Sequence, residues 1–228
     1  MAAVAREPSG TAGVEALYPF LYAGTTDLDA VLEEVRHSTV AKAAEIVALR
    51  QQVLERDLDR LVACARAMAR SFAAGGRLFA FGNGGSSTDA QALASTFLHP
   101  PSGRRALPAL CLTDDVAVVT ALANDVGFEV VFARQLAAFG RPGDVAVGLS
   151  TSGNSDNLIR AFEEASRRGL LTVGLAGYQG GKMAETDTID HLFVVPSSSV
   201  HRIQEAQTTV YHVLWTLTLA ALDTADGS

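Results

Sequence analysis

Residues 145–162, VAVGLSTSGNSDNLIRAF, join a short apolar run to a loop of small polar residues and then to a helical pattern. The run Val145–Leu149 has no polar side chain, as a strand requires when both of its faces are covered. Residues 78–97, LFAFGNGGSSTDAQALASTF, show the same order of strand, loop and helix. This alternation predicts an α/β fold with a parallel sheet and helices on both sides.

Five apolar runs are expected to form the strands of this sheet. They are Leu78–Phe81, Leu107–Leu112, Val145–Leu149, Leu171–Leu175 and Leu192–Val195. The chain before them divides into a flexible arm over residues 1–25 and a helical extension over residues 26–75, which we expect to serve oligomerisation. The extension predicts two or three helices, with a break near Ser38-Thr39 or Arg56-Asp57. Residues 76–223 form the α/β domain, and a buried amphipathic helix covers Ile203–Leu222.

The composition excludes several classes of protein. The net charge of −7 argues against nonspecific nucleic-acid binding, which needs a basic surface. No apolar stretch is long and uninterrupted enough to predict a membrane span. Cys64 and Cys111 are too few for a disulfide framework or a four-thiolate zinc site, so we expect both in the core of a cytoplasmic protein. Charged residues make up only 19%, which favours extra surface buried in an oligomer.

Two loops follow strands at the edge of the sheet where ligands of such folds bind. The loop from Gly82 to Asp89 is rich in glycine, but it lacks the lysine of a Walker loop, and Ser87 replaces the third glycine of the dinucleotide motif. A purely structural turn is the alternative there. The loop from Ser150 to Ser155 brings four hydroxyls to a helix N-terminus, which can hold a phosphate without lysine. Simple helix capping by one serine is the alternative.

Together these loops resemble the sugar isomerase (SIS) domain, and the similarity is closest to the phosphoheptose isomerase branch. It includes GNGGS after the first strand and STSGNS after the third. It extends through Asn124-Asp125, the segment Gly180–Ala184 and Arg202–Glu205, and so covers about residues 28–222.

The resemblance implies a three-layer sandwich with a five-stranded parallel sheet, assembled as a homotetramer with active sites between subunits. It implies three groups of ligand-binding residues. These are Ser150, Thr151, Ser152 and Ser155 for the phosphate, Asn83, Gly84, Gly85 and Ser86 along the sugar, and Asn124, Asp125 and Gln204 for the sugar hydroxyls.

The sequence departs from that family at the catalytic positions. The family converts sedoheptulose 7-phosphate into a heptose 7-phosphate with a glutamate and a histidine, and related enzymes hold zinc. Counted from the first loop, the glutamate position is Thr96 and a zinc-binding histidine position is Ala92. Gln204 and His212 remain, which are too few donors for tight zinc, so we expect no metal and no cofactor.

The remaining histidines leave the chemistry open. His212 is either a surviving acid–base residue or a histidine held by hydrogen bonds in a core or interface. His99 or His201 could supply the missing base, and both could equally be solvent-exposed ends of helices. Two functions therefore compete: an aldose–ketose isomerase acting on a sugar phosphate, and a sugar-phosphate sensor or tetrameric adaptor similar to an SIS protein that associates with the replication initiator. Any protein partner is unknown.

Overall fold

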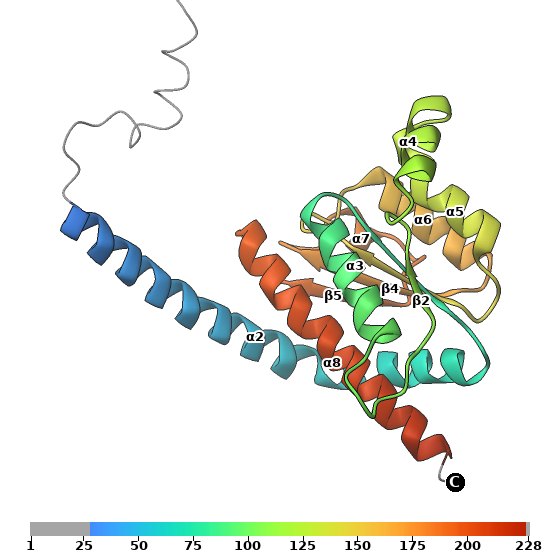
Figure 1. Cartoon of the computed structure of the whole chain (residues 1–228), viewed down its shortest axis with the longest axis horizontal. Coiled ribbons are helices and arrows are strands. Elements are labelled where there is room, and N and C mark those ends of the chain that lie inside the picture. Colours follow the sequence, from blue (N-terminus) through green and yellow to red (C-terminus); the bar gives the residue numbers. More distant parts are fainter. Residues whose placement is uncertain (1–27, 227–228) are drawn as a thin grey trace, which may run out of the picture. The chain divides into compact units, whose positions relative to one another are not determined.

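The computed structural model describes residues 28–226, so the predicted arm over residues 1–25 lies outside the described residues. Five parallel strands form one sheet in the order β2-β1-β3-β4-β5 (Figure 1). They are β1 (Leu78–Gly82), β2 (Ala109–Cys111), β3 (Val145–Leu149), β4 (Leu171–Gly177) and β5 (His191–Val195). The predicted five-stranded parallel sheet is confirmed. β2 is shorter than Leu107–Leu112 because the Leu107 N–H bonds to the Phe97 carbonyl instead of a strand.

Helices cover both faces of the sheet, which confirms the three-layer prediction (Figure 1). Along the chain they are α2 (Leu28–Ala73), α3 (Gly85–Leu98), α4 (Val116–Asp125), the 3-10 turn η2 (Phe128–Val130), α5 (Val131–Phe139), α6 (Asp156–Arg167), α7 (Lys182–Glu185) and α8 (Val200–Asp226). Side chains alternate between two cores along β1, as a strand dictates: Leu78 joins α3, α8 and the second half of α2, whereas Phe79 joins α5 and α6.

The N-terminal extension corrects one prediction, because α2 is a single helix from Leu28 to Ala73 and has neither expected break. The hydroxyl of Thr39 donates to the Val35 carbonyl within the helix instead of capping a new one. Asp57 is buried at 1% exposure and pairs with Arg56 and Arg60, so this carboxylate stabilises a continuous helix where we expected a helix start. No proline or glycine occurs within α2 to interrupt it.

Contacts divide the chain into two units, residues 1–45 and residues 46–228. The reason is that apolar side chains of α2 from Ile46 onward belong to the same core as the sheet. At its other end, the chain finishes in α8, which is longer than the predicted Ile203–Leu222. Among residues 28–226, no helix is long and apolar enough to cross a membrane.

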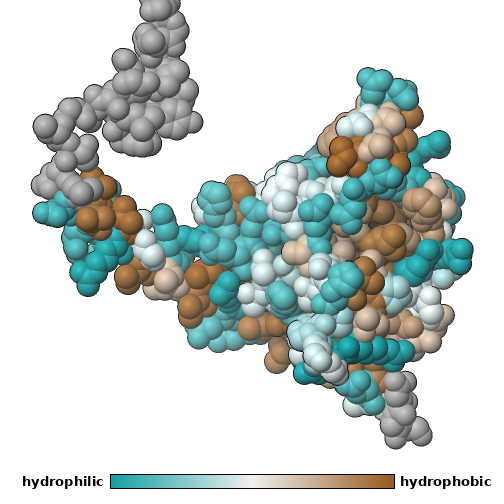
Figure 2. Space-filling view, viewed as in Figure 1, coloured by the Kyte–Doolittle hydropathy of each residue, from teal (hydrophilic) through white to brown (hydrophobic). Residues whose placement is uncertain are grey.

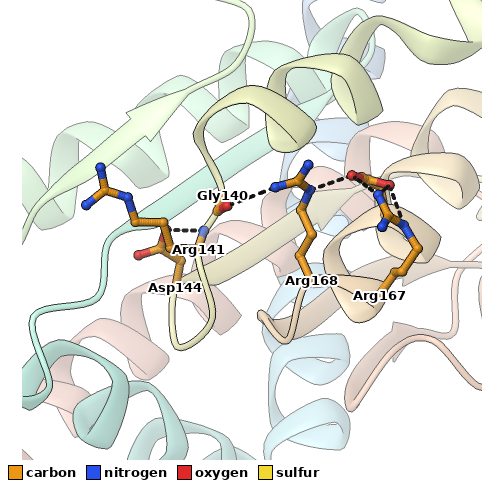
Figure 3. Close-up of polar contacts among 6 residues, drawn as sticks. Gly140, Arg141, Asp144, Arg167 and Arg168 are labelled. Atoms are coloured by element: carbon orange, nitrogen blue, oxygen red, sulfur yellow. Dashed lines mark hydrogen bonds and ion pairs between the residues drawn. The ribbon is translucent and has the colours of Figure 1, made fainter.

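The amino ends of β3 and β4 are held by charged contacts (Figure 3). The buried Asp144 carboxylate accepts a hydrogen bond of 2.9 Å from the Arg141 backbone N–H. Arg168 pairs with Glu164 and donates to the Gly140 carbonyl at 3.4 Å. Because ligands of parallel sheets bind at the carboxyl ends, these contacts serve the fold and leave the opposite edge for the site.

Candidate functional site

The two loops predicted to bind ligand follow β1 and β3, which are adjacent in the sheet. From β1 the chain continues to the edge strand β2, whereas from β3 it continues in the opposite direction to β4. The loops therefore diverge at the point where the strand order reverses, which is where open α/β sheets form their ligand crevice. The topology thus places Asn83–Ser86 and Ser150–Ser155 at the same edge of the sheet.

The hydroxyl loop from Ser150 to Ser155 is closed by its own side chains. The Gly153 N–H donates to the Ser150 hydroxyl at 2.9 Å, and the Asn154 N–H donates to the Ser152 hydroxyl at 3.2 Å. The Ser150 carbonyl accepts from the buried amide of Gln207 on α8 at 3.0 Å. Ser150 itself is buried, so one of its functions is to shape the loop.

Ser155 at the start of α6 does not act as the simple helix cap that we considered. It occupies the N-cap position but makes no side-chain cap hydrogen bond. Neither its hydroxyl nor that of Thr151 bonds to another described residue, and both side chains are partly exposed. The start of this 12-residue helix therefore presents the unused Ser155 hydroxyl beside backbone N–H groups, an arrangement that can bind an anion.

The segment after β4 supports the hydroxyl loop. Gly153 has a φ of +70°, and a Cβ there would lie 1.9 Å from the Gly180 carbonyl oxygen, so only glycine fits. The N–H groups of Lys182 and Met183 donate to the Asn154 side chain and the Gly153 carbonyl.

Lys182 is a cation beside this loop, in the segment Gly180–Ala184 that we matched to the family without giving this lysine a role. Its ammonium group pairs with Asp156, at the start of α6, at 2.7 Å. The pair lies in solvent, and the Lys182 hydrogen bond and charge lower the pKa of Asp156. We had expected an anion site to work without lysine, and the Lys182 charge is in fact already engaged by this carboxylate.

On the sugar side, α3 begins at Gly85, so the predicted loop ends before residue 89. The Asn83 amide is engaged by Asn157 of α6: each side chain donates to the other, both at 2.9 Å. Asn157 is buried, and it joins the two loops directly. It was not predicted, although it stands two residues after the STSGNS motif. Gly84 is exposed and Ser86 is buried.

Gln204 of α8, which we expected to contact the sugar hydroxyls, lies against the first loop. A Cβ on Gly85 would come within 2.5 Å of the Gln204 amide nitrogen. That nitrogen donates to the Asp89 carboxylate at 2.9 Å. Burial raises the pKa of Asp89, and the hydrogen bond from Gln204 offsets part of this effect. Asp89 was expected only as the end of a loop.

Asn124 and Asp125 are not brought to these residues by any contact within the described chain. Both are exposed at the end of α4, where the Asn124 amide donates to the Asp125 carboxylate at 2.7 Å. His212 is exposed on α8, two turns or about 12 Å along the helix from Gln204. Its ring lies 4.9 Å from that of Tyr211.

The positions that hold zinc in related enzymes do not fit zinc in this chain. Ala92 has no donor, and the Thr96 hydroxyl donates to the Ala92 carbonyl at 2.8 Å. Of the four positions, only Gln204 and His212 have side chains that can coordinate a metal, which is too few for tight zinc. Among the described residues, no group of three or more His, Cys, Asp or Glu side chains could hold a metal ion.

The two histidines considered as substitutes lie at helix ends. His99 is exposed after the last residue of α3, about 21 Å along the helix from Gly85. His201 is exposed in the first turn of α8, which follows β5 at the ligand edge.

Comparisons of the sequence and of the structure with known proteins find the same kind of relative. A family model described as the SIS domain matches residues 42–177. The phosphoheptose isomerase of Nitratidesulfovibrio vulgaris is 42% identical over 82% of this chain and 89% of its own length. The phosphoheptose isomerase of Chlorobaculum tepidum is 43% identical over 84% of this chain and 88% of its own length. The structure of phosphoheptose isomerase from Neisseria gonorrhoeae superposes with a TM-score of 0.73 at 36% identity, covering 85% of this chain and 100% of that one.

Proposed function

The chain belongs to the SIS domain family, among relatives named phosphoheptose isomerase, and from this premise we propose that it binds a seven-carbon sugar phosphate of the sedoheptulose 7-phosphate type. One observation carries the proposal. The hydroxyl loop presents the unbonded Ser155 hydroxyl at the N-terminus of α6 and the unbonded Thr151 hydroxyl just after β3, at the edge of the sheet that also carries the first loop. Neutral hydroxyl and amide donors at a helix start suit a phosphate dianion.

In this proposal the phosphate contacts the loop from Ser150 to Ser155, and the sugar extends toward Asn83–Ser86 and Gln204. Because Asn83 is already paired with Asn157, its role is to hold the loop, and the Gln204 carbonyl oxygen and the backbone around Gly84 contact the sugar hydroxyls. Asn124 and Asp125 contact sugar only after α4 rearranges or a second subunit supplies them.

Isomerisation requires groups that exchange protons near neutral pH. His212 is the one family position of this kind that remains, since the Thr96 hydroxyl does not ionise in this range. We propose the isomerase type of activity on the strength of the relatives, with His212 as one acid–base group. The second candidate is a sensor that binds the sugar phosphate without converting it; the threonine at position 96 is the feature in its support, and the relatives named phosphoheptose isomerase do not favour it.

The assembly proposed is a homotetramer in the cytoplasm that binds neither nucleic acid nor membrane. Exposed apolar side chains on and after α4 support burial between subunits: Val116, Val126 and Phe128 are 66%, 58% and 54% exposed. Figure 2 shows hydrophobic surface in the region of α4. Light scattering should give a mass well above the 23.9 kDa of one chain. A monomer at micromolar concentration would contradict the assembly.

The test of function combines calorimetry with NMR. Wild-type protein is titrated with sedoheptulose 7-phosphate and, separately, incubated with it while product is followed by NMR. Binding with turnover supports the isomerase, and binding without turnover supports the sensor. Absence of binding at millimolar ligand would refute the proposed function. Free sedoheptulose, which lacks the phosphate, is the control ligand and should bind more weakly.

A further inference from the structure

A second pocket lies between α2 and α8, apart from the two loops, and most of its lining surface is apolar. Its volume is about 490 Å³, and its polar lining consists of Arg50, Thr208, Thr209, His212 and Thr216. Val213 and Leu217 supply apolar walls. No carboxylate lines the pocket, so its lining carries one permanent positive charge, one imidazole and hydroxyls.

Arg50 has donors that the chain leaves unused. One terminal nitrogen donates to the Glu205 carbonyl at 3.3 Å, which is a long hydrogen bond. Its Nε–H is buried and has no partner among residues 28–226. The carboxylate of Glu205 pairs with Arg202 instead. A guanidinium offers five N–H donors in a planar fork that matches an oxyanion, and a buried donor without a partner costs free energy.

From this arrangement we propose that the pocket binds a small oxyanion, either phosphate or a carboxylate, held by the Arg50 fork with the ring N–H of His212 as a second donor. The three threonine hydroxyls donate to helix carbonyls one turn earlier, so they are not the primary donors. The Thr209 bond is the longest, at 3.5 Å, and its hydroxyl can turn to the anion at least cost. With one imidazole and no carboxylate, the lining does not suit a metal cation.

The inference goes beyond the proposed function, because it uses none of the hydroxyls of the loop from Ser150 to Ser155. The net charge of −7 repels anions at long range, so binding is measured at an ionic strength of about 0.1 M, which screens this repulsion much more than a direct contact in the pocket. His212 serves both proposals, and its substitution is therefore used only to assign its signal.

The experiment follows the His212 ring signal by NMR in full-length protein with labelled histidine, assigned with the variant His212→Gln. Inorganic phosphate and acetate are titrated separately at constant pH and ionic strength. Phosphate, acetate or both should move this signal saturably, which identifies the oxyanion. Arg50→Met should weaken the effect about tenfold or more, because a charge-assisted fork is lost.

The matched control is Arg66→Met, which removes the same charge from the same helix at a residue that lines a different groove. This control and Ser152→Ala/Ser155→Ala should leave the His212 response unchanged. If neither anion moves the signal, or if Arg50→Met responds like wild type, the second site is refuted. Should Arg50→Met fail to fold, Arg50→Lys keeps the charge and loses the fork, and an unaltered response would likewise refute the role of the guanidinium. Loss of sugar-phosphate binding in the serine variant alone concerns the first site only.

Discussion

Replacing Asn157 with alanine should separate the two loops of the crevice. In the native chain, two hydrogen bonds of 2.9 Å join the Asn157 and Asn83 amides, and Asn157 is 3% exposed. Losing two such bonds costs about 1 kcal/mol each. The Asn83 amide is then left half-buried without its partner, which adds about 1 kcal/mol. The variant should therefore lose about 3 kcal/mol of unfolding free energy, the sum of these two effects.

The assay is urea denaturation of four proteins at one concentration. They are the wild type, Asn83→Ala, Asn157→Ala and the double variant. In the double variant no amide remains unpaired, so its loss should be about 2 kcal/mol and not the roughly 6 kcal/mol expected from independent sites. Asn124→Ala is the control, since it removes an exposed amide that bonds only to its neighbour Asp125, and it should change stability by no more than about 0.5 kcal/mol.

The same variants test function. Without the amide pair, affinity for sedoheptulose 7-phosphate should fall more than affinity for inorganic phosphate. The reason is that phosphate contacts only the loop from Ser150 to Ser155, whereas the sugar phosphate needs both loops in their native relative positions. Additive losses in the double variant, or a single-variant loss below about 1 kcal/mol, would refute the coupling of the loops through this pair.

Three further predictions follow from the site. Ser152→Ala with Ser155→Ala should weaken sugar-phosphate binding at least about tenfold in calorimetry, because hydrogen bonds to charged groups are strong, and unchanged affinity would place the phosphate elsewhere. Burial raises the pKa of Asp89 in the folded state, so its ionisation begins to oppose folding above the ordinary aspartate pKa of about 4 and does so fully above the raised pKa. Asp89→Asn should therefore have a larger unfolding free energy than wild type at pH 7, and this difference should vanish below about pH 4. A wild type that is more stable than the variant at pH 7 would contradict this prediction. Purified protein should carry far less than one zinc per chain by elemental analysis, and stoichiometric zinc that survives dialysis would contradict the poor donor set.

The sheet could be predicted because consecutive apolar residues followed by polar loops are a local signal. Continuity of α2 could not be predicted in the same way. Asp57 looked like a helix start because aspartate commonly caps helices, but its carboxylate is satisfied by Arg56 and Arg60 from within the helix. Side-chain pairing thus overrides a capping preference that is worth only about 1 kcal/mol.

Within the site, the loops were predictable and their supports were not. The glycines and hydroxyls are adjacent in sequence, so their spacing is visible. Asp89 meets Gln204 across 115 positions and Asn83 meets Asn157 across 74, and no local pattern marks such pairs. Arg50 gave no signal at all, because a single arginine on a long helix is ordinarily a solvated residue.

The hydroxyl loop shows which residues of a recognised motif argue for a ligand and which argue only for the fold. Ser150 and Gly153 are required by the loop itself. The Ser150 hydroxyl accepts a hydrogen bond from the Gly153 N–H, and a side chain at position 153 would collide with the Gly180 carbonyl oxygen. Their presence would be expected even in a protein that binds nothing. The hydroxyls of Thr151 and Ser155 have no such structural partner among the described residues, although Thr151 follows β3 and Ser155 stands at the start of α6, both at the ligand edge of the sheet. Substitutions at these two positions therefore separate phosphate binding from folding, whereas substitutions at Ser150 or Gly153 would confuse the two.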